Sequence, residues 1–392
     1  MVTRPGDQPK SPLIVFAGGG TGGHLFPALA IADALRRRLP GVRFVFFATQ
    51  RPIDRRVLTE AGCDLVQQTL PTINYAPWHW LRMYLGYRQS SLLCRSRFES
   101  DRPAVVIGTG GLGSVPAVRR AIRTGIPVAL LNPDTVPGRA NRYLAGSADV
   151  VFVQWEEAVR HFVGSARVVV TGCPVRPEFN QTGRDAGIAR FRLDANRKTL
   201  LVTGASQGAR TINEVVVSNL ALLESRDDWQ VIHLTGDLDY EEVHAAYARR
   251  SIRASLLPFT DHMAEALGAA DLVIARAGAS TLAEITAVGR ASILMPYPYH
   301  KDQHQLANAR CLVRASAARI VHDKVDPARN GPALREVLEQ LMSDDELRGY
   351  MAAAARRLGR GHAASQIADY IVEMVEASGM APSSRRCVGA AG

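Results

Sequence analysis

The fold is decided by Ala17-Gly18-Gly19-Gly20-Thr21-Gly22-Gly23-His24, which stands between the apolar run Leu13-Ile14-Val15-Phe16 and the helix-like Phe26-Pro27-Ala28-Leu29-Ala30. This order predicts a strand, a tight loop and a helix. Glycine lets the backbone adopt positive φ and approach a ligand closely. A helix N-terminus adds free N–H groups and the positive end of the helix dipole. The stretch is therefore typical of a loop that binds phosphate or pyrophosphate.

A second unit of the same kind opens about half-way along the chain. An apolar run, Thr199-Leu200-Leu201-Val202-Thr203, is followed by the glycine-containing loop Gly204-Ala205-Ser206-Gln207-Gly208-Ala209-Arg210. Before it lies Thr171-Gly172-Cys173-Pro174-Val175-Arg176-Pro177, whose prolines and glycine interrupt regular structure and indicate a linker. The two halves begin alike, which predicts two similar domains in tandem.

Short apolar runs alternate with helix-length segments through both halves. This alternation predicts βαβ units and parallel sheets, whose strands are apolar throughout because both faces are covered. The expected strands are Leu13–Ala17, Phe44–Ala48, Val105–Ile107, Val128–Leu131, Val150–Val153, Val168–Thr171, Leu200–Thr203, Gln230–Leu234, Asp271–Ala275 and Ser292–Pro296. The fold class is thus α/β, with two Rossmann-like domains facing each other across a cleft. Ligands in such sheets bind beyond the carboxyl ends of the strands.

The expected domain organisation follows from these patterns. A length of 392 residues fits two domains, since a single core seldom grows beyond about 250–300 residues. Residues 1–12 form a flexible N-terminus, 13–175 the first domain and 176–377 the second. The helical stretch from Ala363 to Ala377 packs back across the domains. Residues 378–392, rich in Gly, Ser, Ala and Arg, are expected to be disordered.

Composition narrows the classes of function. The formal net charge of +10 either serves solubility or attracts phosphates. No basic run or aromatic-interleaved basic stretch matches a nucleic-acid module, so no nucleic-acid partner is expected. The five cysteines have no metal-ligand spacing, which indicates a reducing, cytoplasmic compartment and no metal site. No signal peptide and no membrane-spanning apolar segment is expected.

The first glycine loop also has the formal pattern of a dinucleotide site. Gly18, Gly20 and Gly23 match G-x-G-x-x-G, which requires an acidic residue at the end of the second strand. That strand ends in Ala48-Thr49-Gln50-Arg51, without a carboxylate. The absence argues against NAD, whereas Arg51 leaves an NADP oxidoreductase as an outside alternative.

Two further loops follow neighbouring strands of the second half. Arg276-Ala277-Gly278-Ala279-Ser280-Thr281-Leu282-Ala283-Glu284-Ile285 leads into a helix beginning near Ser280 or Thr281, whose N–H groups and hydroxyls suit an anion. Glu284 either closes a capping box with Thr281 or grips ribose hydroxyls. Pro296-Tyr297-Pro298-Tyr299-His300-Lys301-Asp302-Gln303-His304-Gln305 is either a solvated loop or a site for sugar hydroxyls.

A stretch in the first half is rich in aromatic and basic residues. Trp78-His79-Trp80-Leu81-Arg82-Met83-Tyr84-Leu85-Gly86-Tyr87-Arg88 combines Trp, Tyr and Arg in a helix-length segment. One helical face of this composition can dock at a membrane interface, and packing into the core is the alternative.

These ordered motifs resemble the MurG family of glycosyltransferases over nearly the whole chain, from about Leu13 to Ala377. The motifs that carry the resemblance are Gly18 to Pro27, Gly108-Thr109-Gly110-Gly111, Thr171 to Arg176, Gly204 to Arg210, Arg276 to Glu284, and His300 to Gln305 followed by Asn308-Ala309. The resemblance implies a GT-B fold. It also implies inverting transfer of GlcNAc from UDP-GlcNAc to the 4-hydroxyl of MurNAc in lipid I. Lipid I is undecaprenyl-pyrophosphoryl-MurNAc-pentapeptide, and the product is lipid II of peptidoglycan synthesis.

The resemblance also implies roles for individual residues, with no metal and no cofactor. The donor site would comprise Arg176, Ser206, Thr260 at the uracil, Ala279, Ser280, Thr281, Leu282 and Ala283 at the phosphate, Glu284 at the ribose, and His304 and Gln305 at the GlcNAc hydroxyls. Thr21, Gly22 and Gly23 would face the acceptor pyrophosphate. His24 would be the general base, or alternatively would cap or orient its loop. The lipid-linked acceptor implies peripheral contact with the cytoplasmic face of the membrane.

The acceptor half departs from the family pattern. The family usually has His-Glu-Gln-Asn where this chain has Leu131-Asn132-Pro133-Asp134, and Leu112 replaces an aromatic residue. The alternatives are therefore a related glycosyltransferase with another lipid or small-molecule acceptor, a UDP-GlcNAc 2-epimerase, and a non-catalytic UDP-sugar-binding protein.

Overall fold

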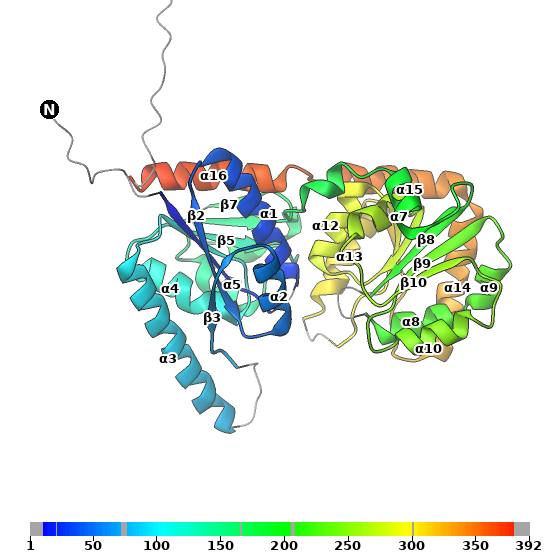
Figure 1. Ribbon diagram of the computed structural model, residues 1–392, viewed down its shortest axis with the longest axis horizontal. Helices are drawn as coiled ribbons and strands as arrows, with labels where there is room; N and C mark the ends of the chain where they lie inside the picture. The colour runs from blue at the N-terminus through cyan, green and yellow to red at the C-terminus, as the bar shows by residue number, and fades with distance from the viewer. Residues whose placement is uncertain are drawn as a thin grey trace, which may run out of the picture.

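The computed structural model describes residues 11–20, 22–71, 77–164, 167–204, 208–299 and 302–379. They form two α/β units, each a parallel sheet with helices on both faces (Figure 1). The expected α/β class with two Rossmann-like domains is confirmed.

The first sheet has the strand order β3-β2-β1-β4-β5-β6-β7. Its strands are β1 (Leu13–Ala17), β2 (Arg43–Thr49), β3 (Asp64–Gln68), β4 (Val105–Gly108), β5 (Val128–Asn132), β6 (Val150–Val153) and β7 (Val168–Val170). The helices of this unit are α1 (Gly22–Arg38), α2 (Pro52–Glu60), α3 (Pro77–Ser100), α4 (Val115–Arg123), α5 (Arg139–Ala145) and α6 (Glu156–Val159). Strands β1, β4, β5 and β6 are buried along their whole length, as expected for a sheet covered on both faces.

The second sheet has the order β10-β9-β8-β11-β12-β13. Its strands are β8 (Lys198–Thr203), β9 (Trp229–Leu234), β10 (Ala254–Leu257), β11 (Leu272–Ala275), β12 (Ala291–Leu294) and β13 (Ala318–Ile320). The helices are α7 (Arg184–Phe191), α8 (Arg210–Val217), α9 (Leu220–Glu224), α10 (Tyr240–Tyr247), α11 (Met263–Ala269), α12 (Ala279–Val288), α13 (His304–Arg314), α14 (Pro327–Ser343), α15 (Asp345–Leu358) and α16 (Ala363–Ala377).

In both sheets the order in which strands are added changes side after the third strand, so the switch point lies between β1 and β4 in the first sheet and between β8 and β11 in the second. Such a switch point leaves a crevice at the carboxyl end of the central strands, where ligands bind in sheets of this kind. The loops that follow β1 and β11 therefore occupy the binding position of their sheets. These are the first glycine loop and the turn before α12.

Three strands, β3, β10 and β13, are not predicted by the sequence pattern. All three lie at the edges of their sheets and read DLVQQ, ASLL and ARI. Most of their residues are only partly buried. These three strands keep polar residues and lack the continuous apolar run that marks the predicted strands, which include β7 at the other edge of the first sheet.

The final helix, α16, belongs spatially to the first unit. Helix α15 packs against α12 and β12 of the second unit, whereas α16 packs against α1 (Figure 1). Its buried residues Ile367, Ile371 and Val375 join the core of the first sheet. At its surface, Arg38 donates to Asp369 at 2.5 Å. The chain thus ends by covering the domain with which it began.

We expect Ile371→Ala to destabilise the first unit by about 2–5 kcal/mol, because it leaves a cavity where α16 meets the sheet. Ile371 is fully buried, whereas Glu373 on the same helix is exposed. Urea unfolding of Ile371→Ala and of the control Glu373→Ala checks this. Equal unfolding midpoints for the two variants would contradict the packing role.

Candidate active site

The first glycine loop holds His24 in one orientation. His24 lies on the first turn of α1, and its Nδ1 is 2.9 Å from the Gly19 carbonyl oxygen. A carbonyl can only accept, so Nδ1 carries the proton and Nε2 is left as the basic nitrogen. A Cβ at Gly110 would come within 3.2 Å of Nε2, so the loop after β4 needs glycine there. Thr21 lies outside the described residues.

A buried carboxylate that the sequence analysis missed anchors this loop. Asp54, on the first turn of α2, is fully buried and accepts the Gly20 N–H at 2.8 and 2.9 Å. It also accepts from the N–H and the hydroxyl of Thr49. Asp54 lies three positions beyond Arg51, on the helix that follows the second strand. Because Asp54 is bonded to the loop itself, it cannot serve ribose hydroxyls, which further weakens the dinucleotide alternative.

The turn before α12 differs from the capping box considered above. The helix begins at Ala279, and Gly278 is its N-cap without a side-chain hydrogen bond. The interpretation of Thr281 and Glu284 as a capping box is therefore wrong. The side chains of Ala279, Leu282 and Ala283 are buried, so this turn presents main-chain N–H groups to its surroundings.

The N-termini of α1 and α12 meet across the boundary between the two units. The two helices are in contact, and Ser280 Oγ donates to the Gly23 carbonyl oxygen at 3.3 Å. Each N-terminus carries the positive end of a helix dipole. Two anion-binding helix ends, Gly22–Gly23 and Ala279–Ser280, therefore face one small region of the molecule.

Glu284 lies beside this region and has an unusual protonation equilibrium. Burial raises the pKa of its carboxyl group to about 7, while Arg176 acts to lower it and Glu178 to raise it. Arg176 pairs with Glu178 at 3.1 Å and stacks on Phe26 of α1 at 5.2 Å. The charges around Glu284 thus come from the linker between the units, and Arg176 reaches back to the first domain.

The loop after β12 forms the far side of the region. His304 Nδ1 lies 2.8 Å from Asp302 Oδ1, and Gln305 Oε1 accepts the Tyr297 N–H at 2.9 Å. These bonds fold the start of α13 back onto the loop. His300 and Lys301 lie outside the described residues.

Thr260 is a further expected donor-site position. Thr260 follows β10, and its Oγ1 accepts the His262 N–H at 3.1 Å. Its neighbour Phe259 stacks under Arg56 of the first unit at 5.0 Å, so this loop also borders the domain boundary. Ser206 lies outside the described residues.

Arg276, the first residue of the α12 motif, has a structural role. It is buried and donates to Asp323 at 2.9 Å, to the Met295 carbonyl and to the Thr211 hydroxyl. Burial alone would raise the pKa of Asp323, but bonds from Thr211, the Val325 N–H and Arg276 lower it overall. This network ties the loops after β11 and β12 together.

The segment that departs from the family pattern joins the two units. Asn308 on α13 donates to Asp134 Oδ1 at 2.8 Å and accepts the Thr135 N–H at 2.8 Å. Asn132 instead accepts from Asn141 at 3.1 Å and braces its own loop. The altered residues therefore hold the second domain against the first.

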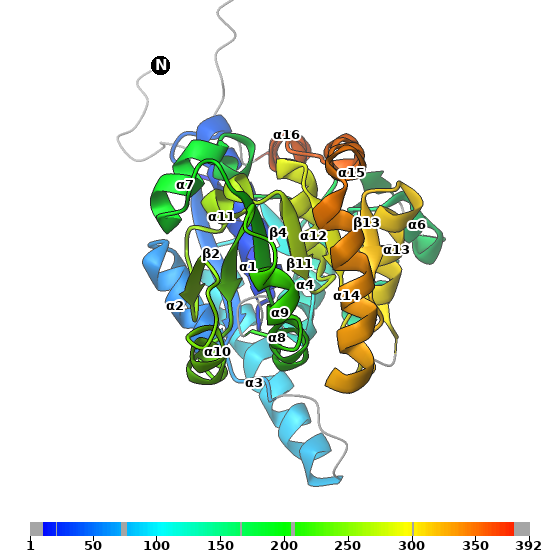
Figure 2. The ribbon, with the colours of Figure 1, turned by 90° about the vertical axis from the view of Figure 1, so that its right-hand side faces the viewer.

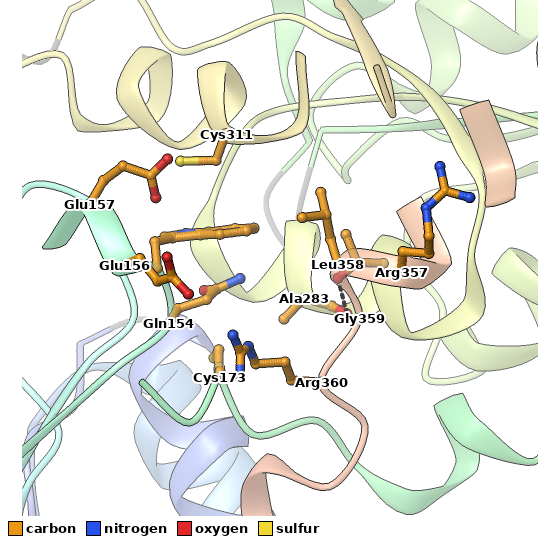
Figure 3. A pocket seen from close by; sticks show the side chains of 13 residues that line it. Gln154, Glu156, Glu157, Cys173, Ala283, Cys311, Arg357, Leu358, Gly359 and Arg360 are labelled. Atoms are coloured by element: carbon orange, nitrogen blue, oxygen red, sulfur yellow. Dashed lines mark hydrogen bonds between the residues drawn. The ribbon is translucent and has the colours of Figure 1, made fainter. Parts of the chain in front are cut away.

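A cavity of about 790 Å³ lies at the back of the same boundary, and Figure 3 shows it from close by. It is lined by both connections between the units, Gly172–Cys173 and Arg357–Arg360. Glu157 of the first unit and Cys311 of α13 point toward each other across it (Figure 3). Of the expected site residues in the described chain, Ala283 alone lines it, so this cavity lies at the connections between the units and not at the region around His24.

Helix α3 projects from the first unit in both views (Figures 1 and 2). Trp80, Leu81, Tyr84 and Leu85 are each more than half exposed. The core-packing alternative is therefore wrong for these four residues. No helix in the described part of the chain is long and apolar enough to cross a membrane. Within the same residues, no group of three or more His, Cys, Asp or Glu could hold a metal ion.

Comparisons with known proteins agree with this architecture. The N-terminal domain model of glycosyltransferase family 28 matches residues 14–153, and the C-terminal domain model matches 199–371. The UDP-N-acetylglucosamine–N-acetylmuramyl-(pentapeptide) pyrophosphoryl-undecaprenol N-acetylglucosamine transferase of Moorella thermoacetica is 37% identical over 370 residues, which cover 93% of this chain and 99% of that protein. The protein of that name from Thermodesulfovibrio yellowstonii is 35% identical over 363 residues, covering 90% and 96%. The chain belongs to this family of N-acetylglucosamine transferases.

Solved structures extend the comparison. MurG of Acinetobacter baumannii superposes with a TM-score of 0.73 at 26% identity, over 92% of this chain and 99% of that one. A UDP-GlcNAc 2-epimerase from Neisseria meningitidis superposes with a TM-score of 0.66 at 13% identity, over 92% and 100%, which shows the shared fold alone.

The raised pKa of Glu284 predicts a pH-dependent stability. A carboxyl group whose pKa rises from about 4.5 to about 7 on folding favours the folded state below pH 4.5. That contribution is lost as pH rises through 7. We expect Glu284→Gln to unfold a few degrees above the wild type at pH 8 and at the same temperature at pH 4. Thermal unfolding at both pH values, with the exposed Glu336→Gln as control, checks this. A pH-independent difference would contradict the assignment.

Proposed function

We propose that this protein transfers GlcNAc from UDP-GlcNAc to the 4-hydroxyl of MurNAc in undecaprenyl-pyrophosphoryl-MurNAc-pentapeptide, with inversion at the anomeric carbon. The observation that carries the proposal is the meeting of the α1 and α12 N-termini beside His24. A transfer between two pyrophosphate-bearing substrates needs two anion sites and one base between them.

The donor would lie on the second domain. The N–H groups at the start of α12 would bind the UDP diphosphate, and the helix dipole would stabilise the charge that develops on it as the C1–O bond breaks. Ser280 and Thr281 would add hydroxyl donors, and Glu284 would accept from the ribose hydroxyls. Thr260 would lie at the uracil, and Gln305 with His304 would read the sugar hydroxyls.

The acceptor would lie on the first domain. Its pyrophosphate would bind at Gly22 and Gly23, and its 4-hydroxyl would approach Nε2 of His24. As O4 bonds to C1 on the face opposite UDP, Nε2 takes the hydroxyl proton and the C1–O electron pair leaves with UDP. The imidazolium then returns its proton to solvent. Tight coupling of these steps requires the two domains to hold a fixed orientation, which the bonds of Asn308 to Asp134 and Thr135 favour.

A lipid-linked acceptor would bring the protein to the cytoplasmic face of the cell membrane. The projecting helix α3 supplies exposed Trp80, Leu81, Tyr84 and Leu85, and Arg82 and Arg88 stand exposed among them. Aromatic rings beside arginines suit the headgroup region of an anionic bilayer. Peripheral contact through α3 follows from this composition.

Transfer of radiolabelled GlcNAc to a lipid I analogue tests the activity. We expect the wild type to form the labelled lipid II analogue and His24→Ala to lose about 100-fold or more in kcat, the usual contribution of a general base. His244→Ala, which changes an exposed histidine on α10, should match the wild type. Binding of UDP-GlcNAc without transfer would support UDP-GlcNAc as the donor and refute lipid I as the acceptor. Release of free sugar would favour the epimerase alternative.

Sedimentation with vesicles tests the membrane contact. We expect the wild type to bind vesicles of phosphatidylglycerol and cardiolipin more strongly than phosphatidylcholine vesicles, because both the aromatic residues and the arginines contribute. Replacing Trp80 and Tyr84 by serine should abolish most of this binding. Tyr350→Ser, at an equally exposed tyrosine on α15, should not change it. Equal binding by all three proteins would refute α3 as the contact.

A further inference from the structure

We propose that Asp54 is a positioning residue that acts on His24 through the Gly19–Gly20 peptide group, so that carboxylate, peptide and imidazole form one hydrogen-bonded chain. The proposal rests on the function proposed above, since it assigns a partner to the base named there. Neither residue of the intervening peptide has a side chain.

The geometry of one peptide group carries the inference. Its N–H belongs to Gly20 and donates to both oxygens of Asp54, at 2.8 and 2.9 Å. Its carbonyl belongs to Gly19 and accepts from His24 Nδ1 at 2.9 Å. The two ends of a single amide thus connect a buried anion with the catalytic imidazole. Hydrogen bonds in such a chain polarise one another, so the carboxylate makes the Gly19 carbonyl a stronger acceptor.

Asp54 is fixed tightly enough for this task. Its side chain is fully buried, and Thr49 contributes two further bonds to Oδ2, from the N–H at 2.9 Å and the hydroxyl at 2.6 Å. A buried carboxylate is tolerated where several donors compensate its lost hydration. Arg51 donates to the Gly20 carbonyl at 2.7 Å and fixes the next peptide. The central amide is therefore held from both sides.

The glycines permit an approach that other residues would block. Gly19 and Gly20 have φ of 129° and 89°, in the region that favours glycine. A Cβ at Gly19 would come within 2.5 Å of Asp54 Oδ2. The run of glycines is thus explained by contact with Asp54 as well as by access for a phosphate.

The consequence for His24 concerns both tautomer and basicity. The carbonyl of Gly19 fixes the proton on Nδ1 and directs Nε2 toward the acceptor hydroxyl. When Nε2 takes a proton, the imidazolium forms at one end of a chain whose other end is anionic, which favours the charged form. An aspartate bonded directly to a catalytic histidine has the same two effects, and here a peptide stands between them.

Other charged groups of this loop and of neighbouring elements must be held constant in a test. Arg51, from the segment before α2, bonds to the Gly20 carbonyl, and Arg176, from the linker, stacks on Phe26 of α1. Glu284 on α12 and Asp134 in the loop after β5 are charged groups of neighbouring elements. None of these changes in an Asp54 variant, so a shift at His24 would report the loss of the Asp54 charge.

Asp54→Asn tests the proposal, with the His24 pKa measured by NMR on protein with labelled histidines and the signal assigned by its loss in His24→Gln. Removing the negative charge disfavours the imidazolium, so we expect the His24 pKa to fall by about half to one unit. Since the base works when deprotonated, the acid limb of the pH profile of kcat should move to lower pH by the same amount. We expect kcat to fall about tenfold, part of the factor that a general base supplies, with the KM for UDP-GlcNAc unchanged.

Asp149→Asn is the matched control, because Asp149 accepts the Val128 N–H at 2.7 Å at the opposite end of the same sheet. It should leave the His24 pKa in place. If Asp54→Asn lowers stability but leaves the His24 pKa and the acid limb unchanged, Asp54 is structural and the proposal is refuted. Neutral His24 protonated on Nε2 in the wild type would refute it without any variant. The NMR result stands even if lipid I is not the acceptor, so the two proposals fail separately.

Discussion

The arrangement of the site depends on the contact between the N-termini of α1 and α12. Each helix follows a central strand at the switch point of its sheet, so each N-terminus already lies where a parallel sheet binds ligands. Bringing the two switch points together places two positive helix ends side by side. Such a pair is unfavourable in isolation. It becomes favourable when anions occupy both ends.

Several interactions hold the N-termini of α1 and α12 against each other, and these interactions lie away from the helix ends. Helix α16 is the last helix of the chain but packs on the first domain, so the chain connects the two units in two places. Asn308 adds two hydrogen bonds to Asp134 and Thr135. A cavity lies between the two connections. The two units are thus held together by two chain connections and a few polar bonds.

The sequence predicted the central strands, the two glycine-type turns and the extent of α16, because each depends on local pattern: continuous apolar runs, glycine after a strand, and apolar residues at helical spacing. It missed β3, β10 and β13 because these three edge strands include polar residues and lack a continuous apolar run. Of the site, the turn at Ser280 could be predicted because a helix N-terminus follows a strand there. Asp54 could not, because its partner in the glycine loop is the Gly20 N–H, 34 positions away, and that contact leaves no signal in the local sequence.

The hydrogen-bond donors around each carboxyl group distinguish the two acidic residues Asp54 and Glu284. Asp54 is satisfied by four hydrogen bonds within its own domain, so its burial is compensated and it can hold the glycine loop rigid. Glu284 stands near the domain boundary, where burial raises the pKa of its carboxyl group to about 7. A carboxylate that lacks sufficient donors gains most from a ligand that brings hydroxyls, whereas a saturated one gains nothing. Asp54 therefore belongs to the framework of the glycine loop, whereas Glu284, which is only partly buried, is the carboxyl group that the hydroxyls of a ligand would stabilise.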